Sequence, residues 1–149
     1  MTIRLSTGMR NKLLDGGASG GIKNALNLGF INIYQGTQPA SADTGATGTL
    51  LGTVSVDGGG TGLTFDAAVA GVISKAAAET WRFTGLAAGT AGWYRFYPAA
   101  GTPGNLSSTE ARIDGSIGTS GADMNVSNLA IEIGQVNTID AYTFTMPAA

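Results

Sequence analysis

The chain has 149 residues, enough for one domain with a substantial core, and a net charge of −2. It contains no cysteine and no histidine, which excludes disulfides, Ser-His and Cys-His nucleophile pairs and the commonest transition-metal ligand. Only 12% of the residues are charged, and 24 are glycine. A weakly charged, glycine-rich chain with short apolar runs is typical of an all-β protein.

The first 28 residues are predicted to form an N-terminal arm that carries a short helix. Thr7 can cap a helix over residues 8–14, in which Met9, Leu13 and Leu14 share one side, and the glycines that follow would end it. So small a helix buries little apolar surface by itself. We therefore expect the arm to be a docking segment, with a helix packed on its own domain as the alternative.

Charge is distributed unevenly between this arm and the rest of the chain. Residues 1–23 carry four basic groups and one acidic group, which gives +3, whereas the other 126 residues carry four basic and nine acidic groups, which gives −5. This asymmetry suggests docking on an acidic protein surface, and four dispersed basic groups are too few for a nucleic-acid patch. The residues expected to dock are the bases Arg4, Arg10 and Lys12 and the apolar residues Met9, Leu13 and Leu14.

From Phe30 onward, apolar residues recur with the period of two that is typical of strands. Eight or nine strands are expected, separated by turns rich in Gly, Pro, Asn and Asp. This pattern favours an antiparallel two-sheet β-sandwich over residues 29–149. The expected strands cover residues 30–34, 49–56, 63–65, 71–74, 81–83, 93–97, 111–117, 129–133 and 136–146.

Both tryptophans lie between Trp81 and Tyr97, in two aromatic runs joined by a connector of Gly, Leu, Ala and Thr. The runs are predicted to be adjacent antiparallel strands at the centre of the core. Alternation places Tyr94 and Phe96 inside. Because Arg95 shares the opposite face, we expect a subunit contact or a sheet rim at Trp93, Arg95 and Tyr97.

Catalysis, cofactors and metals are not expected. A glycosidase needs two carboxylates across a cleft, but the acidic residues are scattered and none forms a pair in the aromatic stretch. Calcium bound by Asp114 and Asp123 stays open, with solvated loop acids as the alternative. The sequence shows no secretory h-region, and no apolar run approaches the ~18 residues of a membrane span.

Six segments of the chain carry a resemblance to a known family: residues 1–14, 33–40, 71–75, 93–97, 112–116 and 118–125. They resemble small virion proteins encoded by tailed bacteriophages and prophages, specifically capsid cement or decoration proteins. The resemblance implies a jelly-roll-like β-sandwich that binds the outside of the major capsid shell, with the docking residues above against the major capsid protein. It also implies synthesis in the host bacterial cytoplasm, a final place on the capsid surface, and a dimer or trimer.

A carbohydrate- or receptor-binding β-sandwich module on the phage tail or capsid surface is the alternative function. It requires at least one large ring exposed beside polar groups, where it can stack on a sugar. Rings in alternating strands are more often part of a core. The rings concerned are those of Trp81, Trp93, Tyr94 and Tyr97.

Overall fold

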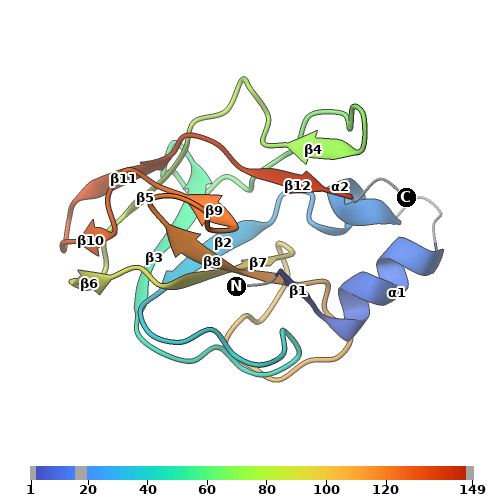
Figure 1. Ribbon diagram of the computed structural model, residues 1–149, viewed down its shortest axis with the longest axis horizontal. Helices are drawn as coiled ribbons and strands as arrows, with labels where there is room; N and C mark the ends of the chain where they lie inside the picture. The colour runs from blue at the N-terminus through green and yellow to red at the C-terminus, as the bar shows by residue number, and fades with distance from the viewer. Residues whose placement is uncertain (1–2, 16–19, 147–149) are drawn as a thin grey trace.

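The computed structural model describes residues 3–15 and 20–146, which contain two short helices and twelve strands (Figure 1). A mostly β fold with a short N-terminal helix is therefore confirmed. The helices are α1 (Thr7–Asp15) and α2 (Gly21–Ala25). The strands are β1 (Arg4–Leu5), β2 (Phe30–Tyr34), β3 (Leu50–Val56), β4 (Val72–Ser74), β5 (Trp81–Thr84), β6 (Gly89–Thr90), β7 (Trp93–Tyr97), β8 (Ile113–Gly118), β9 (Met124–Asn125), β10 (Ala130–Ile131), β11 (Val136–Ile139) and β12 (Thr143–Thr145).

Eight of these strands form the main sheet, in the order β1-β8-β7-β2-β3-β5-β11, with β9 also on β8. Every pairing along that order is antiparallel, and only β9 runs parallel to its neighbour. Two small sheets pair β6 with β10 and β4 with β12.

The predicted pairing of the two aromatic runs is wrong. Strand β5 pairs with β3 and β11, and β7 pairs with β2 and β8, so two strands separate them in the sheet. The connector between the runs is too long to fix a tight hairpin. It instead forms β6 on β10, and the Leu86 amide donates to the Leu51 carbonyl of β3 at 2.8 Å.

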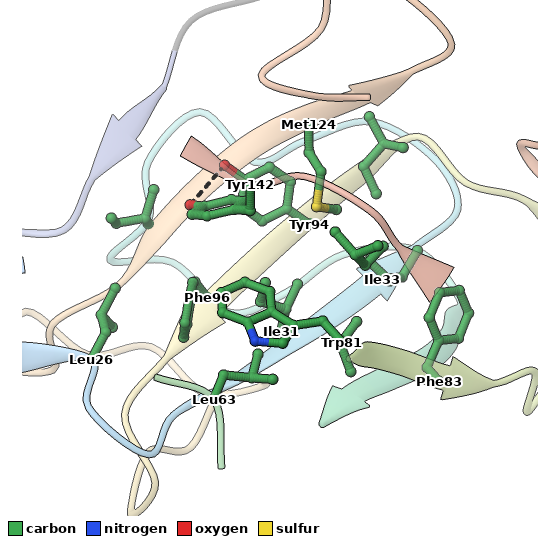
Figure 2. Packing of buried hydrophobic residues seen from close by; sticks show 14 of the residues in the cluster. Leu26, Ile31, Ile33, Leu63, Trp81, Phe83, Tyr94, Phe96, Met124 and Tyr142 are labelled. Carbon is green, nitrogen blue, oxygen red and sulfur yellow. Dashed lines mark hydrogen bonds between the residues drawn. The ribbon is translucent and has the colours of Figure 1, made fainter. Parts of the chain in front are cut away.

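The aromatic residues nevertheless meet, because both runs contribute side chains to one core cluster, in which Figure 2 shows Trp81, Tyr94, Phe96 and Tyr142. The rings of Trp81 and Phe96 lie edge to face with centroids 6.0 Å apart, and Phe65 packs against both. Tyr94 and Tyr142 share a hydrogen bond of 3.1 Å between their hydroxyls. All five rings are buried, each contributing about 1.5–3 kcal/mol by removal of apolar surface from water. The inward placement predicted for Tyr94 and Phe96 is thus confirmed.

Strand β7 is also buried on its opposite face. The Arg95 guanidinium donates to both carboxylate oxygens of Asp114 at 2.7 Å and to the carbonyls of Thr44 and Pro103 at 2.8 Å. These carbonyls belong to two loops, residues 35–49 between β2 and β3 and residues 98–110 between β7 and β8. Arg95 therefore holds both loops against the outer face of the sheet.

The prediction of a contact face at Trp93, Arg95 and Tyr97 is wrong in its premise. Trp93 and Arg95 have no exposed surface, and Tyr97 is 9% exposed. Trp93 stacks on Tyr34 with ring centroids 4.5 Å apart and lies under the Arg95 guanidinium. Alternation correctly separated the two faces of β7, but it could not show that loops cover the second one. These three residues therefore leave almost no surface for a second subunit.

Candidate docking groove beside the N-terminal helices

The described N-terminal residues pack on the body of the protein. Strand β1 pairs with β8, and the Ser6 hydroxyl donates to the Glu110 carbonyl at 2.6 Å and accepts from the Arg112 amide at 2.8 Å. Met9 has no exposed surface, and it shares the core cluster with Ile22 and Leu26. The alternative of a helix packed on its own domain therefore describes this segment, and a free arm does not.

Helix α1 begins against loop 35–49. The Asp43 carboxylate accepts hydrogen bonds from the Thr7 amide at 2.7 Å and the Thr7 hydroxyl at 2.6 Å. It thus satisfies an amide that the first turn of a helix leaves unpaired. Partial burial raises the pKa of Asp43, but the bonds from Thr7 outweigh it and hold that pKa below its ordinary value of 3.8.

The helix also approaches loop 98–110 more closely than a side chain would permit. A Cβ atom on Gly8 would lie 2.2 Å from the Thr109 carbonyl oxygen and 2.5 Å from that of Glu110. Because those neighbours are backbone atoms, they cannot move aside as a flexible side chain could. The glycine is what lets α1 dock at this distance.

The predicted docking residues separate into buried and exposed groups. Met9 is buried in the core, and the Arg4 guanidinium bonds the Ala40 carbonyl of loop 35–49, so both serve the chain's own packing. Arg10 and Lys12 are exposed. Leu13 is half-buried, whereas the side chain of Leu14 lies outside the described residues. Of the three residues predicted to form an apolar anchor, Leu13 is thus the one that the structure describes at the surface.

Leu13 lines an apolar groove of about 290 Å³. Residues of α2 form another part of its lining, and residues in and around β4 and β12 complete it. Lys23 is the only ionisable residue among those that line it. The lining residues are Leu13, Gly21, Ile22, Lys23, Ala68, Gly71, Ile73, Phe144 and Met146. Such a groove suits an apolar side chain with a carboxylate beside it.

Sequence reasoning missed the C-terminal wall of this groove. The alternation of Tyr142, Phe144 and Met146 indicated a half-buried strand, and their burial instead declines along the chain. Tyr142 is 2% exposed, Phe144 is half-buried and Met146 is 55% exposed. Nothing in the local pattern indicated that this end of the chain pairs with β4 and meets the N-terminal helices.

Other predicted sites are not assembled. Both carboxylate oxygens of Asp114 accept from Arg95, and Asp123 accepts from the amide and hydroxyl of Ser116. Asp114 is therefore not free to bind calcium, as the calcium hypothesis required. Within residues 3–15 and 20–146, no group of three or more acidic side chains is placed to hold a metal ion.

The aromatic platform required for sugar stacking is missing. Trp81, Trp93 and Tyr94 have no exposed surface, and Tyr97 is 9% exposed. Burial raises the pKa of Tyr97 to about 12, which reflects the same enclosure.

In the part of the chain that the structure describes, no helix is long and apolar enough to cross a membrane. Comparison with protein-family models, curated protein sequences and solved structures found no match to this chain.

Proposed function

We propose that this protein is a structural virion protein that binds the outside of a tailed-phage capsid and cements or decorates the major capsid shell. The observation that carries the proposal is the apolar groove that Leu13 lines, with Lys23 at its wall and further bases exposed on α1. A partner would fill it with an apolar side chain flanked by acidic residues. The resemblance of the sequence segments to phage virion proteins is the reason for proposing the major capsid protein as that partner.

The structure of the body is suited to such a role. The loops over the sheet are fixed by buried guanidinium groups. A pre-ordered surface loses little conformational entropy on binding. Many copies on one shell would add avidity to a contact of this size. We therefore propose a non-enzymatic protein that acts by protein–protein contacts.

The finer architecture belongs to the same proposal. Strand β3 pairs with β2 through Leu50–Val54 and with β5 through Ser55 and Val56, so it is the strand at which the main sheet turns. We propose that this turn divides the sheet into the two layers of a jelly-roll-like sandwich. We further propose that the protein is a homo-oligomer on the capsid surface, with contacts outside the covered face of β7.

Co-sedimentation with shells of the major capsid protein of the same virus tests the function. Deleting residues 1–23 is unsuitable, because it removes Met9 and Ile22 from the core. We would use Met146→Asp and Lys23→Glu, since both residues line the groove and both are exposed. Each substitution should weaken binding by about tenfold or more, which corresponds to about 1.4 kcal/mol.

Leu106→Asp is the matched control, because Leu106 is 78% exposed, apolar and absent from the groove lining. It should bind shells as the wild type does. Equal binding by all three variants would exclude the groove as the docking site. A wild-type protein that fails to sediment with the shells would exclude the capsid function itself.

A further inference from the structure

Strand β11 is a free edge of the main sheet. It pairs with β5, and no further strand follows it among the described residues. The Gly85 amide donates to the Gln135 carbonyl at 2.8 Å. Because the backbone groups of successive residues in an antiparallel pair point alternately toward and away from the neighbouring strand, this bond determines which residues of β11 face β5. Asn137 and Ile139 therefore direct their backbone groups toward β5, and Val136 and Thr138 direct theirs outward. The outward groups form two donor and two acceptor positions along this edge.

A cavity of about 340 Å³ lies against that edge. Six consecutive residues, 135–140, line it, although alternate side chains of a strand point to opposite faces. Consecutive residues can share one cavity when the cavity lies along the backbone edge. Residues 126–128 also line it. The cavity is therefore a slot beside the unpaired edge of β11, and another part of the chain contributes to its lining.

The slot has an apolar floor and a polar rim. Buried side chains of the core reach it, among them Ile33, Phe83 and Ile131. Ser127, Asn128 and Asn137 contribute polar groups, and Asp140 is the only ionisable residue that lines it. An occupant would place an apolar side chain on the floor and a neutral or basic group near Asp140. An acidic occupant would be repelled.

Strand β11 is short, which is one of the features by which proteins protect an edge, but it lacks others. Its sequence, Val-Asn-Thr-Ile, contains no proline and no charged residue, and no register shift interrupts its pairing with β5 over residues 136–139. Val136 is 59% exposed. An edge of this kind beside a slot is suited to an added strand.

We propose that β11 accepts an extended segment of a partner protein, which adds to the main sheet as a strand beside β11. The segment is three to five residues long, places an apolar side chain on the slot floor, and carries a basic rather than an acidic residue toward Asp140. This inference does not depend on the capsid proposal, because the slot and the groove share no lining residue.

A synthetic peptide tests the proposal without a known partner. Acetyl-Lys-Val-Thr-Val-Thr-amide, laid antiparallel to β11, places its lysine opposite Asp140 and both valines toward the slot floor. Amide hydrogen exchange of the full chain, followed by NMR, is the readout. In the free protein Val136 and Thr138 should exchange fast and Asn137 and Ile139 slowly. At millimolar peptide, exchange at Val136 and Thr138 should slow by about tenfold.

Two control peptides make the result specific. Methylation of the amide nitrogen of the central threonine removes a donor to β11 and should abolish the protection. Replacement of the lysine by glutamate should weaken it. Equal protection by the methylated peptide, or no protection by the parent peptide, would overturn strand addition. Protection that instead grows with protein concentration, without peptide, would assign the edge to a second copy and would also overturn the proposal.

A variant of the protein provides an independent check. Thr138→Pro removes an outward amide and is compatible with an edge strand, whereas Thr138→Val keeps that amide. Peptide binding should be lost in the first variant and retained in the second. Equal peptide affinities in the two variants would contradict the proposal.

Discussion

The two faces of strand β7 are both buried, but different interactions hold them. On the inner face, Tyr94 and Phe96 pack among other rings. On the outer face, Arg95 bonds a carboxylate and two loop carbonyls. Apolar packing tolerates exchange of one hydrophobic residue for another of similar volume, whereas a buried ion pair fails when one partner is removed. The inner face therefore supplies stability in proportion to area, and the outer face supplies a defined loop geometry.

The largest effect is expected from Phe96→Ala on the inner face. Phe96 has no exposed surface and contacts Trp81, Phe65 and Tyr142, so its removal leaves a cavity that these rings cannot fill. The free energy of unfolding should fall by about 3–5 kcal/mol, measured by urea denaturation. Phe96→Leu should cost clearly less. Equal losses in both variants would mean that packing volume does not control this face.

On the outer face, Arg95→Met should lower the free energy of unfolding by about 3–5 kcal/mol, because Asp114 is left buried without its partner. The double variant Arg95→Met with Asp114→Leu should recover much of that loss in urea denaturation. Both variants lack the bonds from Arg95 to Thr44 and Pro103. Amides in loops 35–49 and 98–110 should therefore exchange fast in the single variant and in the double variant alike. Slow exchange there would show that the loops do not depend on Arg95.

Gly8→Ala tests the contact between α1 and loop 98–110. The new Cβ would meet the backbone of Thr109 and Glu110, so the helix must shift outward. Overpacking of this kind should cost about 1–3 kcal/mol in urea denaturation. Gly104→Ala is the control, because a Cβ there would meet no atom within 4 Å and Gly104 has no positive φ. A helix that tolerated Gly8→Ala as well as the control would not be packed as described.

The smallest effect is expected from Asp43→Asn. It should lower the free energy of unfolding by about 0.5–2 kcal/mol at neutral pH, because the hydrogen bonds from Thr7 become weaker. The pKa of Asp43 lies below its ordinary value of 3.8 in the folded protein. Its stabilisation is therefore complete above pH 3.8 and lost as pH falls through the lowered pKa. The stability difference from the wild type should shrink over that acidic range, as measured by thermal unfolding. A difference that stayed constant would mean that the charge is not involved.

Local pattern was sufficient to predict the inner face. The period of two in β7 placed Tyr94 and Phe96 inside, as burial shows. A short helix near the N-terminus was also predicted correctly, but its cap is Ser6, whose hydroxyl accepts from the Met9 amide at 3.0 Å, and the predicted Thr7 lies within the helix. The predicted glycine stop lies outside the described residues. These features depend on residues close together in sequence, where spacing determines direction.

The outer face depends on contacts between distant residues, which spacing does not encode. Arg95 looked like a surface residue because charged side chains are rarely buried without a partner. That partner, Asp114, lies on the neighbouring strand β8, directly opposite in register. The docking groove has the same origin, since Leu13 and Met146 line it together although they are near opposite ends of the chain. Only the tertiary fold brings such residues together.

The guanidinium groups of Arg95 and Arg112 have a consequence for cleavage of the chain. Arg95 bonds the Pro103 carbonyl at 2.8 Å, and Arg112 bonds the Asn105 carbonyl at the same distance. A break beside Gly104 would therefore leave each new end fastened to the sheet by its own arginine. The protein should survive a single nick at this position.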